Sequence, residues 1–100
     1  MAYEAGALEA TLNVAAGGDS ELMAELRAAY VEGVARQVDL LERARCDGNW
    51  VVAAMRLKGL AASFHSEALL HLAEEALEGA PGEPTIIRRL KVYIGQFSAT

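Results

Sequence analysis

Apolar residues recur at intervals of three or four positions through the segment 20–44, a period that is typical of an α-helix. The stripe consists of Met23, Leu26, Tyr30, Val34, Val38 and Leu41. Charged residues such as Glu25, Arg36 and Asp39 fill the opposite face, whereas a half-buried strand would alternate at every second residue. The segment therefore predicts a long helix that buries one face against other parts of the chain.

Glycine, proline and small polar residues interrupt the chain at 17–18, 47–49, 65–66 and 79–82. The intervening segments predict one short helix and four longer ones, over 3–16, 20–44, 49–64, from Ser66 onward and from Pro84 onward. Asp19 or Ser20 would cap the second helix and Asn49 the third, because their side-chain oxygens accept bonds from free backbone N–H groups. Ser66 would cap the fourth helix in the same way. Amphipathic helices joined by short turns predict an all-α fold, an antiparallel four-helix bundle with a short extra N-terminal helix.

Length and charge narrow the class of protein further. The 100 residues suit one domain over 1–100, and a hydrophobic content of 53% is enough for one core without metal or disulfide. The net charge of -5, with only 9 Lys and Arg residues, argues against nucleic-acid binding. No apolar run approaches the roughly 20 residues of a membrane span, and the N-terminus lacks a signal-peptide pattern. With Cys46 as its single cysteine, we expect a cytoplasmic protein that binds no membrane.

The segment 54–64 carries the most information about function. Its sequence, Ala-Met-Arg-Leu-Lys-Gly-Leu-Ala-Ala-Ser-Phe, resembles the central helix of the histidine-containing phosphotransfer (HPt) domains of bacterial phosphorelays. That family has His-x-x-Lys-Gly on an exposed helix face, then small residues, an apolar residue and usually a glycine. The segments 17–22, 47–50 and 69–75 are also similar to the family, so the resemblance covers about residues 17–97. It implies an HPt-like bundle whose partners are response-regulator receiver domains and a hybrid sensor kinase.

One departure from the family decides the expected activity. Alignment on Leu57-Lys58-Gly59 places Met55 at the position of the phosphorylated histidine. A thioether cannot accept a phosphoryl group from an aspartyl phosphate, whereas a neutral imidazole nitrogen can. We therefore expect a non-catalytic regulator, not an enzyme, that keeps the face with which the family docks receivers. By the resemblance and by helical spacing, that face consists of Val51, Val52, Met55, Lys58, Gly59 and Ala62.

Two alternatives stay open beside this interpretation. The first is an interaction module, unrelated to phosphotransfer, whose apolar helix face pairs with its own copy as a homodimer. The second is an active phosphotransferase that uses His65 or His71. His65 occupies the family's usual glycine position, ten residues after Met55, which is about 15 Å along a helix. Neither histidine fits the near in-line geometry of phosphoryl transfer at the family's docking surface.

The sequence gives no positive indication of a metal or cofactor. A carboxylate-bridged metal site in a bundle would need inward Glu-x-x-His pairs, whereas Glu67 and His71 are four apart and predicted to point outward. Cys46 has no histidine or second cysteine at zinc-site spacing. We therefore expect no bound metal and no cofactor.

Overall fold

The protein is built from helices. The computed structural model describes residues 2–97, with side chains from residue 6 onward. Its helices are α1 (Ala2–Ala16), α2 (Ser20–Arg43), α3 (Asp47–Phe64), α4 (Glu67–Glu78) and α5 (Pro84–Gly95). Between residues 2 and 97 there is no strand, which confirms the predicted all-α class. No helix in this part of the chain combines the length and apolar character that crossing a membrane requires.

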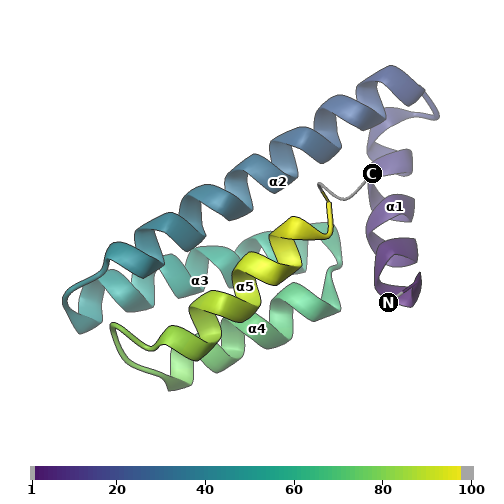
Figure 1. Cartoon of the computed structure of the whole chain (residues 1–100). Coiled ribbons are helices and arrows are strands. Elements are labelled where there is room, and N and C mark those ends of the chain that lie inside the picture. Colours follow the sequence, from purple (N-terminus) through teal and green to yellow (C-terminus); the bar gives the residue numbers. More distant parts are fainter. Residues whose placement is uncertain (1, 98–100) are drawn as a thin grey trace.

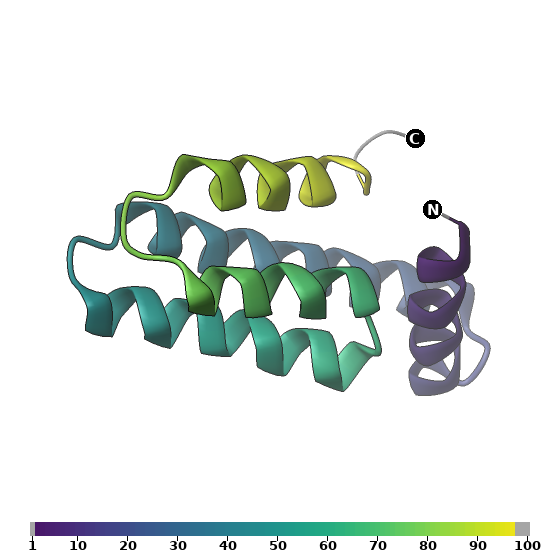
Figure 2. The same cartoon turned by 90° about the horizontal axis from the view of Figure 1, so that it is seen from below.

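Four of the helices lie side by side and the first lies across their end. Figures 1 and 2 show α2, α3, α4 and α5 packed along their lengths, with α1 beside the start of α2 and the end of α3. Helix α3 packs against both α2 and α4, and α5 packs against the same two helices. The end of α3 also contacts α1, and the side of α3 that faces away from these three helices is left for solvent or for a partner.

Side-chain caps fix the starts of two helices as predicted. The carboxylate of Asp19 accepts hydrogen bonds from the backbone N–H of Glu21 at 2.9 Å and of Leu22 at 3.2 Å. The hydroxyl of Ser66 likewise accepts from the N–H of Leu69 at 3.2 Å. These bonds satisfy donors that a helix leaves free in its first turn.

The predicted start of α3 at Asn49 was wrong. The helix begins two residues earlier, at Asp47, and its N-cap residue Cys46 makes no side-chain capping bond. Asn49 lies within the first turn instead. The carboxylate of Asp47 also lies in this turn, where a negative charge interacts favourably with the helix dipole. That interaction helps to explain how α3 begins without a side-chain cap.

The core draws buried side chains from all five helices. Those with almost no exposed surface are Leu8, Leu12, Tyr30, Val34, Val38, Leu41, Trp50, Leu57, Leu69 and Leu90. Buried polar contacts orient the helices around them. The indole N–H of Trp50 donates to the carbonyl of Ala76 at 2.6 Å, which ties α3 to α4. The hydroxyl of Tyr93 lies 2.7 Å from that of Tyr30 and 2.8 Å from that of Ser66.

Candidate functional site

Helix α3 buries one side and exposes the other. Its inward residues are Trp50, Ala53, Ala54, Leu57 and Ala61. On the outer side are the six residues Val51, Val52, Met55, Lys58, Gly59 and Ala62, called the α3 face below. The helical period dictates this division, because residues three and four apart share one side of the helix.

Met55 lies on the exposed side of α3. Its side chain is 51% exposed, and the neighbouring Val52 is 48% exposed. Trp50 and Leu57 lie on the opposite, buried side of α3, where they are 1% and 0% exposed, so Met55 points away from the core. The N-terminal half of the α3 face is therefore an apolar surface that a partner could cover. Methionine suits such a surface because its flexible thioether adapts to different neighbours.

Gly59 is a glycine that the fold itself does not require. A Cβ built at this position would meet no atom within 4 Å outside the local helix. Glycine inside a helix costs about 1 kcal/mol relative to alanine. Close packing of a neighbouring helix therefore does not account for Gly59. The space beside it is open to solvent or to a partner.

Lys58 supplies the positive charge of the α3 face. Its Nζ lies 4.0 Å from a carboxylate oxygen of Glu74 on α4. The two side chains are 41% and 47% exposed, and ion pairs in such positions contribute little to stability. The ammonium group is therefore free to turn toward a negatively charged partner at small cost.

His65 ends α3 in a conformation that usually needs glycine. Its backbone has φ 59° and ψ 42°, the left-handed region that often terminates a helix. Its ring nitrogen Nδ1 lies 2.9 Å from the hydroxyl of Thr11 on α1, and this hydroxyl also donates to the carbonyl of Ala7. The hydroxyl has one proton, so both bonds form together when Nδ1 carries a proton. His65 is thus a junction residue that contacts α1, placed far along α3 from Met55.

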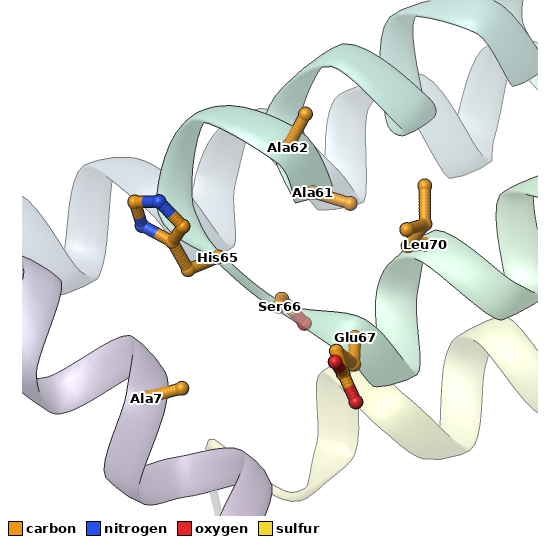
Figure 3. Close-up of a pocket in the computed structure, with 7 residues that line it drawn as sticks. All are labelled: Ala7, Ala61, Ala62, His65, Ser66, Glu67 and Leu70. Carbon is orange, nitrogen blue, oxygen red and sulfur yellow. The ribbon is translucent and has the colours of Figure 1, made fainter.

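An open cavity of about 300 Å³ lies beside this junction. Figure 3 shows the residues around it, which are Ala7, Ala61, Ala62, His65, Ser66, Glu67 and Leu70. Ala62 belongs both to this cavity and to the α3 face. No sequence pattern indicated this cavity, because it forms where α1 meets the α3–α4 junction and no local pattern predicts how α1 packs.

A second hollow, of about 320 Å³, lies between α2 and α3 and is called the α2–α3 groove below. It is lined by Leu40, Arg43, Ala44, Asn49, Val52, Ala53 and Arg56. The sequence held one signal for it, because Leu40 is apolar but lies outside the buried stripe of α2. Leu40 is 41% exposed, whereas the adjacent Leu41 is fully buried.

His71 lies on α4, one turn before Glu74, whose carboxylate lies 4.0 Å from Nζ of Lys58. His71 is exposed, and the carboxylate of Glu75, one turn away, bonds to Arg89 at 2.6 Å. Among residues whose side chains are described, no group of three or more His, Cys, Asp or Glu side chains is arranged to hold a metal ion. His65 lies ten residues beyond Met55, at the C-cap of α3, where its ring bonds to Thr11.

Comparison with known proteins adds no relative to this description. A scan against models of protein families, a search of curated proteins and a search of solved structures each found no match to this chain. The proposed function therefore rests on the α3 face and on the sequence resemblance alone.

Proposed function

We propose that this protein is an HPt-like module that docks response-regulator receiver domains through the α3 face without accepting phosphate. The observation that carries the proposal is the exposure of Met55, 51%, in the register Met-x-x-Lys-Gly on a helix of a bundle. In this proposal α2 to α5 form the antiparallel four-helix bundle of the family, and α1 is an addition to it. A cytoplasmic location and a hybrid sensor kinase as second partner belong to the same proposal.

The chemistry of residue 55 excludes ordinary phosphotransfer from it. A neutral imidazole attacks phosphorus with a ring nitrogen while the P–O bond to the receiver's aspartate breaks and the carboxylate leaves. The ring then loses its other N–H proton, which leaves a neutral imidazole ring joined to an anionic phosphoryl group. Attack by the sulfur of Met55 would leave a sulfonium cation that has no proton to lose. Lys58 lies three positions further along the same face, where its charge would offset a phosphoaspartate on the receiver. Docking without transfer would compete for a receiver, shield its phosphate or hold it near a kinase.

Titration with purified receiver domains tests the docking. We expect wild-type protein to bind at least one receiver, and Met55→Asp to weaken that binding at least about tenfold, because a carboxylate would be buried in an apolar contact. Val92→Asp is the matched control, since Val92 is 60% exposed on α5, away from the α3 face. Absence of binding to every receiver, or equal losses in both variants, would contradict the proposal. A tight homodimer that buries Met55 would assign the α3 face to self-association.

Restoring the acceptor atom gives a second test. Met55→His should accept phosphate from a phosphorylated receiver, because only the acceptor atom is missing in this proposal. Acid-labile phosphate on the protein is the readout, and wild type should show none. Labelling of wild type that disappears in a His65 or His71 variant would show that the protein is a working phosphotransferase.

A further inference from the structure

The lining of the α2–α3 groove combines apolar and basic side chains. Leu40 and Val52 are 41% and 48% exposed, although both are large apolar side chains. Arg43 and Arg56 line the same groove, and its lining among the described residues contains no carboxylate. Arg36 lies one helical turn before Leu40 on the same side of α2. This concentration of arginines is unusual in a chain whose net charge is -5.

These arginines are available for a partner. Arg36 and Arg56 are exposed and form no ion pair with any side chain described in the structure. Arg43 pairs with Asp39 at 3.0 Å, but the two side chains are 73% and 51% exposed. Such an exposed pair is weak, so exchanging Asp39 for a carboxylate of a partner costs little. Guanidinium groups bind carboxylates with two parallel hydrogen bonds, which favours this exchange.

We infer that the α2–α3 groove binds an acidic amphipathic helix of a partner protein. Its apolar side chains would cover Leu40 and Val52, and its flanking glutamates or aspartates would pair with Arg43 and Arg56. Helices that lie in grooves present apolar residues at i, i+3, i+4 and i+7, which suits a hollow with apolar side chains between two helices. The inference rests on the proposed function in one respect, because Val52 belongs both to this groove and to the α3 face.

Other occupants fit the groove less well. A second copy placed with its groove on this one would bring Arg43 and Arg56 against the same guanidinium groups, and like charges facing each other across an interface are costly. An anionic membrane would attract the arginines, but a membrane surface is broad while Leu40 and Val52 line a hollow. An acidic and partly apolar helix matches both the hollow and the positive charge of the α2–α3 groove.

Titration of the full chain with a labelled synthetic peptide tests this inference. The peptide is a helix of about 18 residues with leucines on one face and glutamates beside them, and its twin has lysine in place of glutamate. We expect the protein to bind the acidic peptide at least ten times more tightly than the basic twin. The affinity for the acidic peptide should fall as salt is added. Arg43→Glu combined with Arg56→Glu should weaken acidic-peptide binding roughly tenfold or more.

Arg88→Glu is the matched control, because Arg88 is exposed on α5 and equally reverses a positive charge. Its peptide binding should equal that of wild type, and thermal unfolding followed by circular dichroism should show that all variants fold. Failure to bind the acidic peptide, equal binding of both peptides, or equal losses in the Arg88 and groove variants would overturn the inference. So would binding to phosphatidylserine vesicles, or dimer formation by light scattering, in the absence of peptide binding. If the protein binds a receiver through Met55 but does not bind the peptide, only this inference is overturned. If it binds the peptide but no receiver, only the proposed function is overturned.

Discussion

Gly59 allows the proposed docking surface to be separated from the needs of the fold. Substitution by alanine adds one methyl group to the middle of α3, on the α3 face. Within the chain this methyl would meet no atom within 4 Å, so it creates no clash. Alanine is favoured over glycine inside a helix by about 1 kcal/mol. Gly59→Ala should therefore stabilise the protein by about 1 kcal/mol, which for a domain of this size raises Tm by about 4–8 °C.

The same methyl should weaken docking. If a receiver packs closely on Gly59, the added group must displace atoms of the partner, and overpacking of this kind costs about 1–3 kcal/mol. Affinity should fall by roughly 5- to 150-fold, while the unbound protein becomes more stable. Opposite changes in stability and in affinity are unusual for a damaging substitution, and they distinguish a binding surface from a structural defect.

Two measurements on two variants complete this test. Tm is followed by circular dichroism, and the receiver Kd is measured by calorimetry. Gly33→Ala is the matched control, because Gly33 lies inside α2 and a Cβ there would make an ordinary contact of 3.9 Å with Leu60 of α3. Gly33→Ala should raise Tm by a similar amount and leave Kd unchanged. If Gly59→Ala does not raise Tm, the space around Gly59 is not open as described. If Tm rises and Kd is unchanged, Gly59 has no role in docking.

Three further substitutions test the fold by thermal or urea unfolding. Tyr93→Phe removes the hydroxyl that bonds to Tyr30 and Ser66 and should cost about 1–3 kcal/mol; a loss below about 0.5 kcal/mol would contradict this role. Gln37→Met should stabilise by about 1 kcal/mol, because the Oε1 atom of Gln37 is buried without a hydrogen-bond partner among the described residues, and destabilisation would refute this. His65→Ala should be about 1 kcal/mol less stable than His65→Gly, since both lose the bond to α1 but only alanine keeps the left-handed strain. Equal stabilities of these two variants would contradict that assignment.

The sequence predicted the features that depend on helical period and on local caps. The exposure of Met55 follows from the spacing of Trp50 and Leu57, and the caps at Asp19 and Ser66 follow from the free N–H groups of a first turn. The start of α3 was missed because an acidic residue in the first turn can take the place of a side-chain cap, and the two patterns look alike in sequence.

Features that depend on how helices meet could not be predicted in this way. The bond between His65 and Thr11 joins residues 54 positions apart, so no local pattern contains it. The α2–α3 groove likewise depends on which side of α2 faces Val52 and Arg56. Only the out-of-phase Leu40 indicated it, and a single exposed leucine is common on protein surfaces.

The alanines beneath the α3 face have a consequence for how firmly it is supported. Ala53, Ala54 and Ala61 have no rotamers to rearrange, and between them Trp50 is held by its bond to the carbonyl of Ala76. Apart from Leu57, the buried side of α3 near Met55 therefore contains few side chains that can change rotamer. A partner would bind a surface that is already ordered, so little binding free energy would be lost in ordering α3.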